Sequence, residues 1–285
     1  MSFDADSLGI RATGFVLLRD LVSERCGLYS DVARLDGWAD RLAPLVAERH
    51  FTSFLDYFYL LKYDAAADAE WKRVLDSLSV PETYFWREIR QIETAVNVLV
   101  PQLAAQCGSL PLRIWSIPCA SGEEPLTIAM LLEEHKWFDR ANIELHAADA
   151  SPAAIARARA GEYRERSFRA LPPTLRERYF EPHGDGWRVK ASLHRRVHKW
   201  HVMNLMDCDA ARRVGSAPLI FCRNLFIYFS TSSIRQVVDA FADAMPTPGY
   251  LCVAAAESLL RVTTRFELED IGGSFIYVKR EGPCR

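Results

Sequence analysis

The chain has 285 residues, a formal net charge of −2 and a hydrophobic content of 49%, which exclude a disordered chain and a polycation that binds nucleic acid by charge alone. Its seven cysteines show no CxxC spacing, so we expect buried thiols in a reducing compartment, without a disulfide framework or a zinc site. No apolar run approaches the ~20 residues of a membrane span, and the acidic N-terminal segment lacks a signal-peptide core. We therefore expect a soluble, cytoplasmic protein.

Charge is distributed unevenly along the chain. Residues 1–70 hold 7 basic and 12 acidic side chains, whereas residues 164–199 hold 10 basic and 4 acidic ones. The basic segment would suit an acidic partner. A solvated, arginine-rich face is the simpler interpretation.

The first predicted elements are all helices. Apolar side chains recur at helical spacing in four segments, at residues 15–22, 36–49, 54–61 and 69–78. A Cys26-Gly27 break follows the first helix, and Thr52-Ser53 is expected to cap the third. The pattern predicts an N-terminal helical domain over residues 1–79, followed by a linker helix over residues 80–100.

From residue 112 onward, buried strands alternate with helices. The expected strands cover residues 112–117, 143–148, 219–222, 249–255 and 274–279, and the expected helices cover residues 125–135, 152–160 and 233–245. This alternation predicts an α/β domain over residues 101–285, built on a mostly parallel, doubly wound sheet.

One segment interrupts the alternation. Residues 187–190 and 195–202 both alternate polar and apolar side chains, and the Asp185-Gly186 pair suits a tight hairpin turn. We expect a small antiparallel subdomain inserted at about residues 164–202.

The strongest site signal is the sequence CASGEEP at residues 119–125, between a predicted strand and a predicted helix. We expect Ser121 to cap the helix, with Glu124 completing a capping box, and Gly122 to let the backbone approach a ligand. The segment lacks the pattern of a phosphate loop. The carboxylates of Glu123 and Glu124 suit a cationic ligand such as an amine or a sulfonium. A helix start with acids that favour its dipole is an equal alternative.

Two further signals lie where predicted strands end. Asp149 ends the second strand, 27 residues after Gly122, where an acid commonly accepts hydrogen bonds from ribose hydroxyls. A helix cap explains Asp149 equally well. Arg223 and Asn224 follow an apolar strand and are more easily explained as site residues than as surface residues, whereas Tyr228 fits a packed aromatic.

The segment PETYFWRE at residues 81–88 joins the helical part to the sheet domain. It is too polar for a core helix and too aromatic for a simple linker. Tyr84, Phe85 and Trp86 can serve only to hold the two parts together. Arg87 fits that interpretation less well, although a surface salt bridge would also explain it.

Taken together, these motifs resemble the CheR-type chemotaxis receptor methyltransferases over about residues 11–280. The matching motifs are PETYFWRE, WSIPCASGEEP, Asp149, Asn204-Leu205 and FCRNLFIYF at residues 221–229. The resemblance implies a class I S-adenosylmethionine-dependent methyltransferase, with a Rossmann-like doubly wound sheet, an N-terminal all-α domain and a small antiparallel β-subdomain insertion.

The resemblance also implies roles for individual residues. The residues expected to bind the cofactor are Thr83, Arg87, Cys119, Gly122, Glu123, Glu124, Asp149, Asn204, Leu205, Arg223 and Asn224. Arg87, Arg223 and Tyr228 are expected to border the methyl group as catalytic residues, and no metal is expected. Within the cofactor set, Asp149 would hold the ribose, while Asn204 and Leu205 would line the adenine.

In the family the methyl acceptor is a receptor glutamate, so the resemblance implies O-methylation of glutamate side chains on a chemoreceptor-like protein in bacterial signal transduction. A glutamate carboxylate is ionised at neutral pH and needs no general base. We expect a monomer that contacts no nucleic acid, inserts into no membrane and needs no receptor tail peptide. The alternative is a degenerate relative that binds S-adenosylmethionine or S-adenosylhomocysteine as an adaptor, which the departures at Ile117-Pro118 and at residues 254–256 favour.

Overall fold

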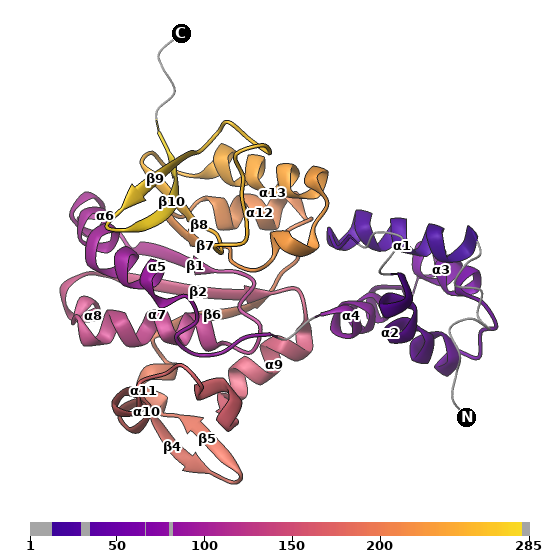
Figure 1. The fold of residues 1–285 in the computed structure, drawn as a ribbon, viewed down its shortest axis with the longest axis horizontal. Coiled ribbons are helices and arrows are strands. Elements are labelled where there is room, and N and C mark those ends of the chain that lie inside the picture. Colours follow the sequence, from indigo (N-terminus) through magenta and orange to yellow (C-terminus); the bar gives the residue numbers. More distant parts are fainter. Residues whose placement is uncertain (1–12, 30–34, 66, 80–81, 281–285) are drawn as a thin grey trace. The chain divides into compact units, whose positions relative to one another are not determined.

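The computed structural model describes residues 13–29, 35–65, 67–79 and 82–280 (Figure 1). The acidic N-terminal segment, Pro81 and Cys284 lie outside these ranges. The chain divides into two compact units: a smaller one of residues 1–80 with 228–236, and a larger one of residues 81–227 with 237–285. The predicted domain limits at residues 79 and 100 stay a prediction.

The described part of the smaller unit holds the helices α1 (Thr13–Cys26), α2 (Leu35–Glu48), α3 (Phe54–Tyr63) and α4 (Ala67–Leu78). The expected helices lie within these elements or within two residues of them. Ser53 caps α3, since its hydroxyl oxygen accepts a hydrogen bond from the Asp56 amide at 3.2 Å. A shared apolar core that includes Phe15, Phe54 and Trp71 holds the helices together.

A buried carboxylate connects the helices of this unit. Glu70 of α4 is fully buried, and its carboxylate accepts hydrogen bonds from Arg49 at 2.5 Å, Tyr57 at 2.8 Å and Arg73 at 3.2 Å. Burial alone would raise the pKa of Glu70, but the hydrogen bonds from Arg49 and Tyr57 and the charge of Arg73 hold that pKa below its ordinary value. The native fold therefore keeps Glu70 ionised.

Replacing Glu70 by glutamine is expected to lower the free energy of unfolding of this unit by about 2 kcal/mol at neutral pH. Because the folded-state pKa is lowered, the stabilisation is present above the unfolded carboxyl pKa of about 4.3 and is lost as the pH falls through the folded value. Urea unfolding of the full chain, followed by circular dichroism from neutral to acid pH, measures the difference in unfolding free energy between the wild type and Glu70→Gln. We expect this difference to become smaller in acid. Glu48→Gln, which removes an exposed partner of Arg73, should cost less than about 0.5 kcal/mol. Equal losses for the two variants would contradict the role of Glu70.

The larger unit is built on a seven-stranded sheet with the order β6-β2-β1-β7-β8-β10-β9. The strands from β6 to β8 run parallel, and β10 is antiparallel to both β8 and β9. Their bounds are β1 (Leu112–Ser116), β2 (Ile143–Asp149), β6 (Val197–Val202), β7 (Leu219–Phe221), β8 (Gly249–Cys252), β9 (Glu267–Ile271) and β10 (Ser274–Lys279). The mostly parallel sheet confirms the predicted α/β class.

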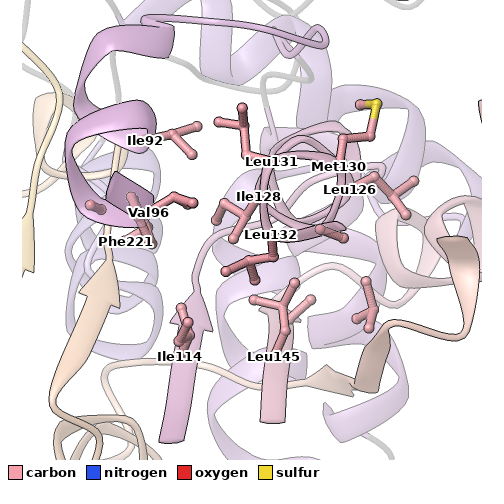
Figure 2. Packing of buried hydrophobic residues seen from close by; sticks show 14 of the residues in the cluster. Ile92, Val96, Ile114, Leu126, Ile128, Met130, Leu131, Leu132, Leu145 and Phe221 are labelled. Carbon is pink, nitrogen blue, oxygen red and sulfur yellow. The ribbon is translucent and has the colours of Figure 1, made fainter. Parts of the chain in front are cut away.

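Helices alternate with these strands along the chain. They are α5 (Ile89–Thr94), η2 (Ala95–Leu99), α6 (Val100–Cys107), α7 (Glu123–Glu134), α8 (Trp137–Arg140), α9 (Pro152–Ala160), α12 (Cys208–Gly215) and α13 (Thr231–Ala244). Figure 2 shows Leu132 of α7 next to the strand residues Ile114 and Leu145, and Ile92 of α5 near Leu131 of α7, in one buried apolar cluster. Burial of these side chains fixes α5 and α7 against the sheet. Among the described residues, no helix combines the length and apolarity needed to cross a bilayer.

A second, antiparallel sheet has the order β3-β5-β4. Its strands are β3 (Glu162–Tyr163), β4 (Phe180–His183) and β5 (Gly186–Val189), with η3 (Glu165–Phe168), α10 (Pro173–Tyr179) and α11 (Ala191–His194) beside them in sequence. The predicted hairpin exists, with its turn at Gly184-Asp185, one residue earlier than expected.

The assignment of residues 195–202 to this insertion is wrong. Val197–Val202 is β6, which pairs in parallel with β2 at the edge of the main sheet. Polar and apolar residues are mixed here because this strand is buried only in part: Val197 and Trp200 are buried, His198 and Lys199 are exposed, and the pairing with β2 is irregular at His198. A half-buried edge strand therefore produces the same pattern as a hairpin strand. Strand β9 was also missed, because its sequence ELEDI is largely polar and exposed.

Several arginines of the basic segment form ion pairs with the chain's own glutamates. The pairs are Arg176–Glu165, Arg178–Glu134, Arg188–Glu162 and Arg196–Glu133. This arrangement favours the interpretation as a solvated, arginine-rich face over that of a patch for an acidic partner.

Candidate functional site

Three loops that carry predicted site residues follow adjacent parallel strands. Ser116, the last residue of β1, pairs with Ala147 of β2 and with Phe221 of β7. The carboxyl ends of these strands therefore meet at one edge of the sheet, which is where open α/β sheets bind ligands. The structure brings together here the segments that begin at Ile117, Asp149 and Cys222.

Asp149 lies at this edge with a largely buried side chain. One carboxylate oxygen accepts a hydrogen bond from the Ala120 amide at 2.9 Å, and the other accepts one from the Ser151 amide at 2.9 Å. Helix α9 is capped by Ser151, whose hydroxyl oxygen accepts from the Ala154 amide. Asp149 is thus not the cap residue, and it links the loop after β1 to the loop after β2.

The start of α7 differs from the predicted capping box. Its N-cap is Gly122, without a side-chain cap, whereas the Ser121 hydroxyl donates to Glu123 and Glu124 accepts from the Ser116 hydroxyl at 2.7 Å. The capping-box prediction was wrong because Ser116, at the end of the strand, holds the carboxylate of Glu124.

The local structure around position 122 explains why this residue is glycine. Its φ is +97°, and an added Cβ would lie 3.0 Å from Trp200, 3.1 Å from Tyr163 and 3.2 Å from Ala158. The space beside Gly122 is filled by protein side chains. Close packing together with a left-handed backbone therefore requires glycine here, and the approach of a ligand to Gly122 stays a prediction.

The two acids of α7 point in different directions. Glu123 is almost fully buried and accepts hydrogen bonds from the hydroxyls of Ser121 at 2.8 Å and Ser167 at 3.0 Å. Burial raises the pKa of Glu123, and these hydrogen bonds limit the rise. Because Ser167 belongs to the segment of the insertion, Glu123 connects α7 to the insertion, whereas Glu124 faces Ser116 and the strand ends.

Arg223 is buried at the centre of a charged cluster. Its guanidinium lies 3.3 Å from the carboxylate of Glu124 and 3.2 Å from that of Glu88, and it also donates to the Arg87 carbonyl at 3.1 Å. Burial raises the pKa of Glu124, and the charge of Arg223 limits that rise. Arg223 therefore connects the linker segment to α7 at the carboxyl end of β7.

The loop after β7 is held by a glutamate that did not appear among the predicted site residues. Glu257 is buried, and its carboxylate accepts hydrogen bonds from four backbone amides, those of Asn224 at 3.0 Å, Phe226 at 2.6 Å, Ile227 at 3.3 Å and Ala254 at 2.8 Å. The signal for it in the sequence was a lone acid after an apolar strand, at Ala256-Glu257. Such a residue is costly to bury unless it has partners.

The linker segment docks on the larger unit. Phe85 is fully buried, with its ring centroid 4.8 Å from Tyr163, 5.2 Å from Phe168 and 4.9 Å from Phe180. Its amide donates to the Ser167 carbonyl at 2.9 Å. The aromatic residue thus packs the linker onto the inserted subdomain.

The linker residues with predicted site roles are less buried. The Arg87 side chain donates to the Glu82 carbonyl and lies over the Tyr84 ring at 5.7 Å. Thr83 is half-buried one residue before Tyr84. Neither observation assigns a ligand contact to Arg87 or Thr83.

The remaining predicted residues have local structural contacts. Cys119 is buried and its amide donates to the Ala148 carbonyl at 2.8 Å. The Asn204 side chain accepts from the Met206 amide at 3.0 Å, and Leu205 is buried beside it in sequence. Tyr228 ends the short helix η4 (Phe226–Tyr228) and counts with the smaller compact unit.

Left-handed backbone accumulates at this edge of the sheet. Glu88 has φ 45°, Ala120 has φ 45° and Asn224 has φ 60°, values that residues other than glycine rarely adopt. Each lies in a segment that contacts Arg223, Asp149 or Glu257. The charged side chains thus hold a backbone that would otherwise relax, as is common where a site is pre-organised.

Comparison with known proteins identifies the family. Residues 81–273 match the family model described as CheR methyltransferase, SAM binding domain. The chain is 31% identical over 272 residues to Chemotaxis protein methyltransferase 2 of Vibrio cholerae, covering 95% of this chain and 94% of that protein. The chain belongs to the CheR methyltransferase family. It is therefore a methyltransferase, and its cofactor is S-adenosylmethionine.

The chain is similar to other methyltransferases as well. Chemotaxis protein methyltransferase 1 of Pseudomonas aeruginosa is 28% identical over 92% of this chain and 96% of its own length. The probable biofilm formation methyltransferase WspC of Pseudomonas putida is 33% identical over 79% of this chain, which corresponds to 52% of its own length.

The side chains at the strand ends fit this cofactor. S-adenosylmethionine carries a sulfonium, an amino group and ribose hydroxyls, and the edge of the sheet presents the acids Asp149 and Glu124. Burial raises the pKa of Glu124, so a cationic ligand beside it would favour its ionised form. This chemistry matches the cofactor that the family membership assigns.

Proposed function

We propose that this CheR-family enzyme methylates glutamate side chains on the cytoplasmic part of a chemoreceptor-like protein. The observation that carries the proposal is the similarity to Chemotaxis protein methyltransferase 2 of V. cholerae over nearly the full length of both chains. The bound cofactor supplies a methyl group activated by its positive sulfur. A receptor glutamate is already ionised at neutral pH, so the protein's task is alignment and no general base is required.

The roles that we propose for individual side chains come from the family resemblance and are supported by their contacts. We assign the ribose hydroxyls to Asp149, which is fixed between the loops after β1 and β2. We assign the sulfonium and amino end of the cofactor to Glu124, and we assign to Glu123 the support of helix α7 from the buried side. Asn204 and Leu205 are assigned to the adenine side.

The basic residues complete the proposed site. Arg223 is held by Glu88 and Glu124, so we assign it the positioning of those acids and of the linker. Arg87, on the same linker and less buried, is the better candidate to offset the charge of the incoming carboxylate. We propose that Thr83, Cys119, Gly122 and Asn224 shape the cofactor side.

Asp149→Ala is expected to weaken S-adenosylhomocysteine binding about 100-fold, because charge-assisted hydrogen bonds to two hydroxyls and the contact to Ala120 are lost together. Calorimetric titration of the full chain measures the dissociation constant. The control is Asp139→Ala, which removes an exposed acid on α8 and should change nothing. Unchanged affinity in Asp149→Ala would exclude the assigned role.

The identity of the acceptor is tested by the chemistry of the label. Radioactive methyl groups transferred to a receptor fragment should leave as methanol in mild base, as an ester does, whereas N-methyl groups would remain. Cofactor binding without transfer to any receptor would instead support the adaptor role.

The short β4–β5 hairpin, with its turn at Gly184-Asp185, supports the proposal that no receptor tail peptide is needed. A monomer is proposed as well.

A further inference from the structure

Three side chains with metal-binding chemistry meet on β2 and β6, away from the cofactor residues. Glu144 and His146 alternate along β2, and His198 lies at the irregularity in the pairing of β6 with β2. One potential ligand atom from each lies within 4.8 Å of the other two. Leu145, between the two β2 residues, is buried in the apolar cluster, so Glu144 and His146 occupy the opposite face of the sheet.

The ring of His146 is held in place by its neighbours. It stacks on Trp115 with ring centroids 4.8 Å apart, and its Nδ1 lies 3.3 Å from Nε2 of His201. This contact leaves Nε2 as the nitrogen that faces Glu144, at 3.5 Å from its carboxylate. Nε2 of His146 is buried and has no hydrogen-bond partner within the described part of the chain. A buried imidazole nitrogen that faces a carboxylate at 3.5 Å without a close hydrogen bond leaves a place where a cation can bind both groups.

We propose that Glu144, His146 and His198 bind one divalent transition-metal ion of the Zn²⁺ type. Two imidazoles and a carboxylate form a ligand set that such ions accept, with a fourth position for water. The contact between His201 and Nδ1 is the kind of supporting interaction that orients a histidine ligand. Bonds of about 2.0–2.2 Å to a shared ion place the ligand atoms roughly 3.3 Å apart. The distances between the three ligand atoms, now up to 4.8 Å, must therefore shorten by up to about 1.5 Å. Rotation of the exposed His198 side chain supplies this change.

Arg113 limits the affinity of this site. Its guanidinium donates to the Glu144 carboxylate at 3.1 Å, so a metal ion must compete with an existing positive charge. His201 and Lys199 add polar and charged groups from β6. We therefore expect micromolar rather than nanomolar binding, and we expect that removing Arg113 strengthens it.

A bound ion would add a cross-link between two strands that are connected by backbone pairing and by the contact of His146 with His201. His198 belongs to the edge strand β6, and the other two ligands belong to β2. Strand β6 ends at Val202, two residues before Asn204. The ion would thus stabilise the edge of the sheet next to the segment proposed to line the adenine.

Zn²⁺ titration of the full chain against a chromogenic metal indicator tests the site. The wild type should bind one ion with a micromolar dissociation constant. Glu144→Gln and His198→Asn should each raise that constant at least tenfold, and Arg113→Gln should lower it several-fold. His135→Asn, which changes an exposed histidine of the segment after α7, and Cys208→Ser, which removes an exposed thiol, should both leave it unchanged.

The proposal would be overturned by a wild type that binds no Zn²⁺ at these concentrations. It would also be overturned if His135→Asn or Cys208→Ser lost binding while His198→Asn kept it. Circular dichroism of each variant verifies that the fold is intact. A rise in the melting temperature of the wild type with Zn²⁺, absent in His198→Asn, is the second readout. Neither measurement needs the methyl donor or a receptor.

Discussion

Glu257→Ala is expected to lower the free energy of unfolding of the larger unit by about 3–5 kcal/mol. The substitution leaves four backbone amides, among them those of Asn224 and Ala254, without their acceptor, and unpaired buried groups carry their full desolvation cost. The loop after β7 should then lose the left-handed conformation at Asn224. We therefore also expect S-adenosylhomocysteine to bind at least tenfold more weakly.

Urea unfolding and calorimetric titration of the full chain measure these two effects. The free energy of unfolding of Glu257→Gln should lie between those of the wild type and the alanine variant. The reason is that the amide oxygen of glutamine still accepts hydrogen bonds from some of the backbone amides, while its NH₂ group repels the others. Glu267→Ala, which removes an exposed acid on β9, should cost less than about 0.5 kcal/mol. If Glu257→Ala loses less than about 1 kcal/mol and retains full affinity, the proposed support of the loop is wrong.

Arg223→Ala is the second substitution with a large expected effect, about 3 kcal/mol of unfolding free energy. It removes the shared partner of Glu88 and Glu124, and it detaches the carbonyl of Arg87. The pKa of Glu124, already raised by burial, should rise further without that charge. Cofactor affinity should fall at least tenfold, since both the acid and the linker lose their position.

The lysine variant separates charge from geometry at this position. Arg223→Lys retains the charge, but a single ammonium cannot hold two carboxylates and a carbonyl at once, so we expect an intermediate loss. Arg265→Ala, which breaks an exposed pair with Asp243, provides the control and should be nearly neutral. Full activity of Arg223→Ala with a receptor substrate would refute both the positioning role and any catalytic role.

Strong periodicity and strand-end chemistry explain what could be predicted from the sequence. The order of strands and helices follows from apolar runs such as residues 219–222. The accumulation of Asp149 and Arg223 at one edge follows from the rule that parallel strands end together. The family motifs added the cofactor. The elements, the strand-end residues and the motifs could be predicted because each depends on neighbouring residues or on a rule that holds for the whole fold class.

The remaining features depend on contacts between distant segments. Strand β6 was assigned to the wrong sheet because alternation records burial of one face but not the identity of the neighbour. Glu257 was missed because its four amide donors come from two separate loops. The Glu144, His146 and His198 cluster has no ligand spacing in sequence, since β2 and β6 are about 50 residues apart and only pairing brings them together.

The position of Phe85 has a consequence for how such chains can be recombined. Its ring lies among Tyr163, Phe168 and Phe180, so the segment that begins at Glu82 folds with the catalytic unit although it precedes the sheet in sequence. In an exchange of N-terminal helices between relatives, a junction before Glu82 would keep Phe85 with its packing partners. A junction after Arg87 would separate a core aromatic from its own packing partners. The position of a junction relative to Glu82 therefore decides whether Phe85 stays with the side chains that it packs against.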